Sequence, residues 1–121
     1  MFRKGSALVA LVAIVSLVAA VAAFGGASST DATAVTVTLG KPAELKITLS
    51  KKTVAPGAAT FKVTNKGALG HDFKIAGKKT VILKTGKSVT LKATLKKGKY
   101  AFLCTVPGHA AAGMKGTLTV K

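Results

Sequence analysis

The sequence predicts an all-β fold, an antiparallel Greek-key β-sandwich or barrel of seven to eight strands. From about residue 35 onward, apolar residues alternate with threonine and lysine at a period of two, which is typical of half-buried strands. Turn-forming sequences separate these runs at the short spacing of sandwich strands. No window has the period of an amphipathic helix. At 121 residues, the chain has room for one such domain of ordinary size.

The expected strands follow in order because a turn sequence closes each apolar run. These turns are APGA at 55–58, NKGALG at 65–70, AGKK at 76–79, TGK at 85–87 and KKGK at 96–99. Alternate side chains of each run are expected to face the core. In chain order they are Val35, Val37 and Leu39; Leu45, Ile47 and Leu49; Phe61 and Val63; Phe73 and Ile75; the run Val81–Leu83; Val89, Leu91, Ala93 and Leu95; Tyr100, Phe102 and Cys104; Leu118 and Val120.

The first 27 residues differ from the rest and are typical of a secretory signal. Arg3 and Lys4 precede an apolar run from about residue 7 to 24, and small residues follow it. The run is also about as long as a minimal membrane span, so an uncleaved N-terminal anchor is the alternative. Either segment places the remainder outside the cytoplasm, as a secreted, periplasmic or envelope-associated protein. The expected divisions are a signal peptide or anchor over 1–27, a linker over 28–34 and the β domain over 35–121.

The charge of the chain is strongly positive. There are 19 Lys and Arg residues against three Asp and Glu residues, a formal net charge of +16, or +14 without the two basic residues of the leader. This favours an acidic protein partner or an anionic membrane or envelope surface, although lysines spread along strands also serve solubility. Nucleic acid is excluded as a partner, because residues 28–121 contain no arginine and few aromatic residues. We expect a monomer.

The stretch CTVPGHAAAGM, residues 104–114, concentrates the rare residues that bind soft metals. It holds Cys104, which is the only cysteine, together with His109 and Met114. Cys104 continues the inward phase of its strand, and Pro107 and Gly108 form a turn that brings His109 back over it. The remaining histidine, His71 in LGHDF, lies at the start of another strand and is the candidate fourth ligand.

The ligand types indicate which metal would bind. Two imidazoles, a thiolate and a weak thioether are the donors of a mononuclear blue-copper site. Zinc prefers a fourth strong ligand, and hard cations prefer oxygen donors, of which the chain has few. The sequence therefore predicts one copper ion as the cofactor.

The spacing C-x4-H-x4-M, together with the upstream GHDF, resembles the cupredoxins, the small exported blue-copper proteins related to plastocyanin and azurin. The resemblance extends over residues 35–121. It implies a Greek-key sandwich and one-electron transfer by a protein that is not an enzyme. It assigns the copper ligands to His71, Cys104, His109 and Met114, and the residue that joins the two ligand loops to Asp72, where the family more often has asparagine. Thr105, directly after the cysteine, is expected beside these ligands.

The resemblance also makes His109 the port through which electrons leave. The small residues around it would let a redox protein partner approach closely. The expected docking face consists of Pro107, Gly108, Ala110, Ala111 and Ala112.

Three other interpretations compete with an electron carrier. Each rare residue taken alone is more often an ordinary buried or surface residue, but together they fall at metal-binding spacing. A cysteine-nucleophile enzyme would use Cys104 with a histidine base, and it leaves Met114 and the other histidine unexplained. An extracytoplasmic copper carrier or chaperone with the same ligands is the remaining alternative.

Overall fold

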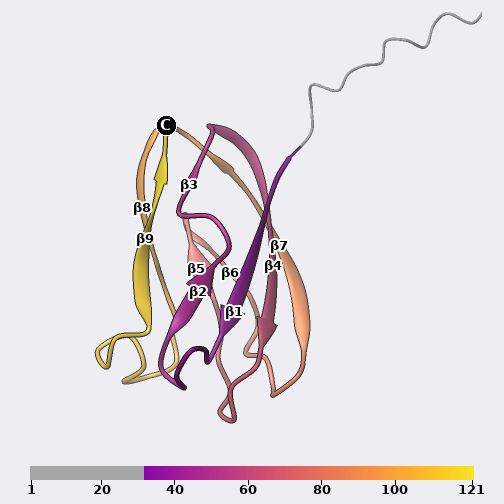
Figure 1. Ribbon diagram of the computed structural model, residues 1–121, viewed down its shortest axis with the longest axis vertical. Helices are drawn as coiled ribbons and strands as arrows, with labels where there is room; N and C mark the ends of the chain where they lie inside the picture. Colours follow the sequence, from indigo (N-terminus) through magenta and orange to yellow (C-terminus); the bar gives the residue numbers. More distant parts are fainter. Residues whose placement is uncertain (1–31) are drawn as a thin grey trace, which may run out of the picture. The chain divides into compact units, whose positions relative to one another are not determined.

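The computed structural model describes residues 32–121, which form nine β-strands and no helix (Figure 1). This part of the chain accordingly has no helix long and apolar enough to cross a membrane. The predicted leader over residues 1–27 lies outside the described residues. The strands are β1 (Thr33–Leu39), β2 (Ile47–Leu49), β3 (Thr53–Val54), β4 (Gly57–Asn65), β5 (Lys74–Ile75), β6 (Lys78–Lys79), β7 (Ser88–Leu95), β8 (Gly98–Leu103) and β9 (Lys115–Val120).

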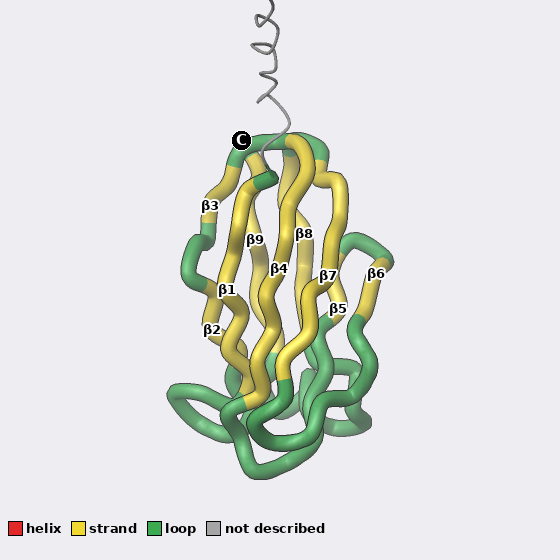
Figure 2. The backbone as a smooth tube through the Cα atoms, turned by 90° about the vertical axis from the view of Figure 1, so that its right-hand side faces the viewer, coloured by secondary structure: helices red, strands yellow, loops and turns green. Residues whose placement is uncertain are grey.

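The strands form two sheets that face each other across one core (Figure 2). One sheet has the order β2-β1-β4-β7 and the other β3-β9-β8-β5-β6. The predicted all-β sandwich is therefore confirmed. Three of the nine strands contain only two residues, and such short pairs leave no alternation to detect in a sequence.

Two pairings differ from the antiparallel arrangement expected from the sequence. β1 pairs with β4 and β3 pairs with β9 in parallel, whereas the other pairs are antiparallel. After β2 the chain crosses to the second sheet as β3 and then returns as β4 beside β1. Because of this crossover, β4 runs in the direction of β1, and the sheets are mixed.

The period-two pattern correctly predicts the core. Aromatic rings lie at its centre, with the Phe73 ring centroid 5.5 Å from that of Phe61 and 5.7 Å from that of Phe102. Burial of such side chains supplies most of the free energy of folding in a small domain. The predicted inward residues that are buried are Val35, Val37, Leu39, Leu49, Phe61, Val63, Phe73, Ile75, Leu83, Ala93, Leu95, Phe102, Cys104, Leu118 and Val120.

The run Val81–Leu83 is not the inward-facing element that its composition suggested. Val81 and Ile82 are 71% and 61% exposed and lie in the connection between β6 and β7. Only Leu83 is buried, and it pairs with His71 in an isolated antiparallel bridge. The bridge places Leu83 in the core and leaves the two residues before it in solvent. Their hydrophobicity was therefore not enough to predict that they are buried.

Candidate metal centre

The loop between β8 and β9 is folded tightly upon itself. Cys104 directly follows β8, and a turn comes next in which His109 N–H donates to the Val106 carbonyl at 3.0 Å. Gly108 occupies this turn with φ of 84°, a conformation that glycine adopts without steric cost. Cys104 N–H donates to the Met114 carbonyl at 3.1 Å, and Met114 N–H donates to the His109 carbonyl at 3.0 Å. The backbone thereby holds the three predicted ligands of this loop together.

The segment that holds His71 is fixed by a buried asparagine at the end of β4. Asn65 donates from Nδ2 to the Leu69 and Leu83 carbonyls at 2.8 and 2.7 Å, and its Oδ1 accepts from Gly67 N–H at 2.8 Å. Two backbone hydrogen bonds between His71 and Leu83 complete the support. His71 is fully buried as a result. Sequence reasoning missed Asn65, whose partners lie up to 18 residues away.

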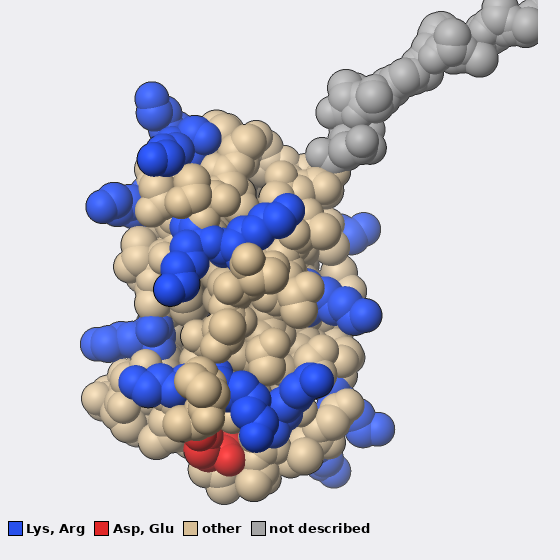
Figure 3. Space-filling model, in the orientation of Figure 1, with Lys and Arg blue, Asp and Glu red and all other residues tan. Residues whose placement is uncertain are grey.

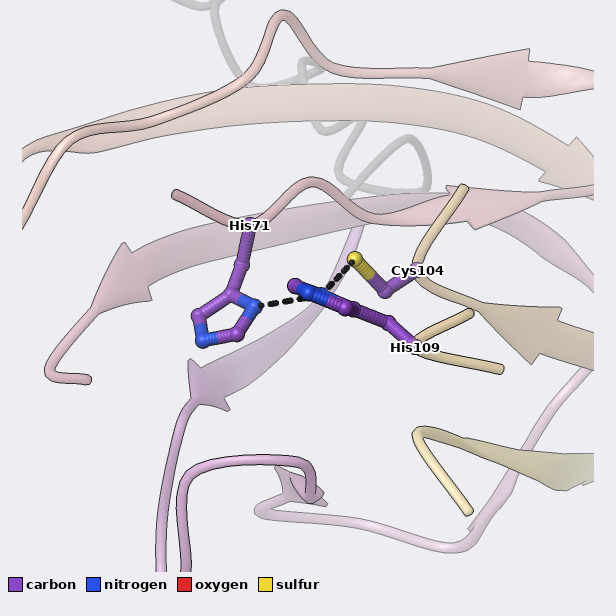
Figure 4. A group of neighbouring side chains, drawn as sticks. All are labelled: His71, Cys104 and His109. Atoms are coloured by element: carbon purple, nitrogen blue, oxygen red, sulfur yellow. Dashed lines mark hydrogen bonds between the residues drawn. The ribbon is translucent and has the colours of Figure 1, made fainter. Parts of the chain in front are cut away.

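Three donor atoms converge from these two loops (Figure 4). Nδ1 of His71 lies 3.2 Å from Nδ1 of His109, which lies 3.5 Å from Sγ of Cys104. All three atoms lie within 4.8 Å of one another. Donors that are each about 2 Å from a shared metal lie about 3.3–3.6 Å apart in trigonal or tetrahedral sites. The donor types and two of the three separations therefore fit a single soft metal ion.

Met114 adjoins this group immediately before β9. It is fully buried, and its backbone is hydrogen-bonded to both Cys104 and His109. A thioether at this place is a weak, soft donor beside two imidazoles and a thiol, which is the combination that suits copper.

A buried carboxylate joins the two loops. Oδ1 of Asp72 accepts from the Thr105 N–H at 2.6 Å, and Oδ2 accepts from the Thr105 hydroxyl. The Asp72 N–H in turn donates to Sγ of Cys104 at 3.5 Å. Asp72 thus lies between the two loops, as expected from the sequence, and its hydrogen-bond partner on the second loop is Thr105.

The protein environment disfavours the thiolate form of the cysteine. Burial raises the pKa of the Cys104 thiol above its ordinary value, and hydrogen bonding by the Asp72 N–H opposes this only in part. Metal binding therefore displaces a proton from the thiol, which makes the affinity depend on pH.

A residue that sequence reasoning missed, Glu44, contacts the outer side of His71. Oε2 of Glu44 lies 2.6 Å from His71 Nε2, and the carboxylate accepts from the Ala68 and Leu69 N–H groups at 2.8 and 3.0 Å. The hydrogen bonds from these two backbone N–H groups, together with the one from the His71 side chain, lower the pKa of Glu44 to about 2. The available signal was the rarity of acidic residues, of which the chain has three.

Nearly all charged side chains on the surface of residues 32–121 are lysines, and Figure 3 shows them scattered over one face among uncharged residues. All of its 17 lysines are exposed, at both ends of the sandwich and along its strands. The two acidic residues in this part of the chain, Glu44 and Asp72, both accept hydrogen bonds from the loops of the candidate site.

The predicted docking residues surround the one partly exposed ligand. His109 and Ala110 are partly exposed, and Pro107, Gly108, Ala111 and Ala112 are exposed. His71 and Cys104, by contrast, have no exposed surface. Of the three clustered donor residues, His109 is thus the one that reaches the protein surface.

Comparison with known proteins agrees with this geometry. A family model for copper-binding proteins of the plastocyanin/azurin family matches residues 33–121. Auracyanin-B of Chloroflexus aurantiacus is 54% identical over 43 residues, which are 34% of this chain and 18% of that protein. The solved structure of auracyanin B matches with a TM-score of 0.66 at 23% identity, over 76% of this chain and 91% of that one.

Two further solved structures share the fold at slightly higher identity. Dithionite-reduced auracyanin from the photosynthetic bacterium Roseiflexus castenholzii has a TM-score of 0.60 and 26% identity, over 76% of this chain and 98% of that one. Rusticyanin from Thiobacillus ferrooxidans has a TM-score of 0.57 and 26% identity, over 73% and 76% of the two chains.

The two-sheet fold and the converging set of nitrogen and sulfur donors define a cupredoxin, a blue-copper protein whose cofactor is one copper ion. The chain belongs to the plastocyanin/azurin family of copper-binding proteins, since the family model covers nearly all of the described residues.

Proposed function

We propose that the protein is an exported electron carrier that holds one copper ion between His71, Cys104, His109 and Met114. The observation that supports this most directly is the convergence of three donor atoms, two of them on fully buried residues, from two loops. Both histidines and the cysteine serve as ligands in this assignment. None of them is then free as a general acid or base, so we propose a carrier rather than an enzyme.

The chain's own residues would keep the site rigid during electron transfer. Copper supplies the redox chemistry by cycling between Cu(II) and Cu(I). The hydrogen bonds among Cys104, His109 and Met114 close one ligand loop, and the contact between Asp72 and Thr105 attaches it to the other. Donors fixed in this way rearrange little when the charge of the metal changes, and their burial excludes water.

We propose that electrons enter and leave through His109. Its partial exposure and the small residues around it support a close approach by a partner. The docking face would be Pro107, Gly108, Ala110, Ala111 and Ala112, and the exposed lysines would steer an acidic redox protein toward the molecule. The signal-like segment over residues 1–27 supports an extracytoplasmic location.

Electron self-exchange tests the function without knowledge of the partner. In a mixture of Cu(I)- and Cu(II)-loaded protein at high ionic strength, NMR line broadening should report exchange between copies. Ala111→Lys should slow this exchange several-fold and leave the visible spectrum intact, because the side chain holds copies apart at the docking face. Ala58→Lys is the control. It adds the same charge at an exposed residue near the start of β4, the end of that strand away from Asn65 and the His71 loop, and it should have little effect.

Equal rates for the two lysine variants would contradict the His109 port. A loaded protein that exchanges no electrons between copies, but rapidly gives its copper to a competing chelator, would contradict electron transfer and indicate copper carriage.

A further inference from the structure

The carboxylate of Glu44 is built into the ligand loop that holds His71. It lies between β1 and β2, far from the ligands in sequence, yet its three hydrogen-bond donors all belong to residues 68–71. Glu44 is therefore attached to the copper site by one carboxylate that contacts both the loop backbone and the ligand itself.

The contact between Glu44 and His71 fits against the backbone because residue 67 is a glycine. A Cβ atom on Gly67 would lie 2.3 Å from Oε2 of Glu44 and 3.0 Å from Nε2 of His71. A side chain at that position would push the end of the Glu44 carboxylate out of its place against the imidazole. The glycine supports the interpretation that this hydrogen bond is a fixed part of the site.

The contact determines which nitrogen of His71 is available to the metal. At 2.6 Å, Nε2–H donates to the carboxylate, so the neutral ring carries its lone pair on Nδ1. Nδ1 is the atom that faces His109 and the thiol side of the site. A hydrogen bond from a ligand imidazole to a carboxylate also raises the basicity of the coordinating nitrogen.

We propose that Glu44 is a positioning residue that holds His71 as the Nε2–H tautomer and lowers the reduction potential of the copper. The inference rests on the proposed ligand role of His71. A more basic imidazole beside a fixed anion stabilises Cu(II) more than Cu(I), because Cu(II) has the higher charge. This is the reason the potential falls.

The test is Glu44→Gln, which keeps the shape of the side chain and removes its charge. Loss of an outer hydrogen-bond partner of a metal ligand typically lowers metal affinity about 10–100-fold. We expect such a loss for Cu(II) and a smaller one for Cu(I), measured by competition with chelators. A tenfold change in the ratio of the two affinities corresponds to a rise of about 59 mV in the potential.

Lys41→Gln is the matched control. Lys41 is an exposed residue of the same loop, and its carbonyl accepts a hydrogen bond from the Thr48 hydroxyl rather than from a residue of the site. Removing its positive charge should leave the potential nearly unchanged or lower it slightly. An unchanged potential in Glu44→Gln, or shifts of equal size in both variants, would overturn the proposal.

Wild-type protein provides a second measurement that does not depend on how the variant folds. NMR of the diamagnetic Cu(I) form should show a slowly exchanging proton on Nε2 of His71. A proton on Nδ1, or a rapidly exchanging Nε2 proton, would overturn the proposal. Failure of the proposed function is distinguishable, because it would appear as a wild-type protein without an intense thiolate-to-copper absorption band.

Discussion

At the scale of single residues, two side chains join the loops on which the whole site depends. Asp72 is fully buried and its carboxylate accepts both the N–H and the hydroxyl of Thr105. Hydrogen bonds to a buried charge contribute more than neutral ones, and a donor left without a partner in the interior costs free energy. The link therefore affects both the stability of the apoprotein and the geometry at Cys104.

Replacing this carboxylate should destabilise the protein measurably. We expect Asp72→Ala to lower the free energy of unfolding of the apoprotein by about 1–3 kcal/mol, because the Thr105 N–H loses its acceptor. Asp72→Asn, which keeps one acceptor oxygen, should cost less. Denaturant unfolding measures both variants.

A double-mutant cycle provides the control for this prediction. Thr105→Val removes only the hydroxyl donor, so its effect should be smaller in the Asp72→Ala background than in wild-type protein. Fully additive effects would show that the two residues do not act through their mutual contact.

The residues of the candidate site differ in how well their roles could be predicted. Cys104, His109 and Met114 lie within one loop, so spacing and strand phase place them together. Glu44 could not be assigned, because 27 residues separate it from His71 and no local pattern relates the two. Contacts between distant loops depend on the topology, which the sequence pattern leaves open.

At the scale of elements, the connection after β1 packs directly against the loop after β4. Gly40 has φ of 84°, and a Cβ atom on it would lie 2.5 Å from Cα of Gly67. This close approach of two backbones brings Glu44 within reach of His71. The β1–β2 connection is thus part of the support for the copper site.

Gly40→Ala tests this packing, with Gly86→Ala as its matched control. Gly86 has nearly the same φ, 83°, but open space where a Cβ would lie. Both variants should lose about 1–2 kcal/mol of unfolding free energy from the left-handed backbone. We expect Gly40→Ala to lose about 1–3 kcal/mol more through overpacking, measured by denaturant unfolding. Equal losses would contradict a tight contact between the two connections.

Strands were predictable where burial alternates over several residues, as in β1, β4, β7, β8 and β9. The run with Phe73 and Ile75 was also located correctly, at β5, but β6 was not, because residues 78–79 were assigned to the turn AGKK and pair with β5 through one hairpin turn. In that turn Ala76 and Gly77 both have positive φ, which alanine rarely adopts. Exposed Val81 and Ile82 show the converse error, a hydrophobic run that no partner strand buries.

At the scale of the whole molecule, positive and negative side chains are distributed differently. Exposed lysines are spread along the strands and loops of residues 32–121, whereas the two acidic residues described there accept hydrogen bonds from the site loops. A strongly cationic surface of this kind speeds encounters with acidic partners and weakens as ionic strength rises. The composition predicted this surface, but only the fold shows where the two carboxylates lie.

The visible spectrum of the Cu(II)-loaded protein distinguishes a single blue-copper site at these ligands from every other arrangement. We expect an intense thiolate-to-copper band that disappears on reduction and is absent from Cys104→Ser, which preserves the size of the side chain. A colourless Cu(II) protein, a protein that binds only Cu(I), or an unchanged band in Cys104→Ser would show that no such site forms there.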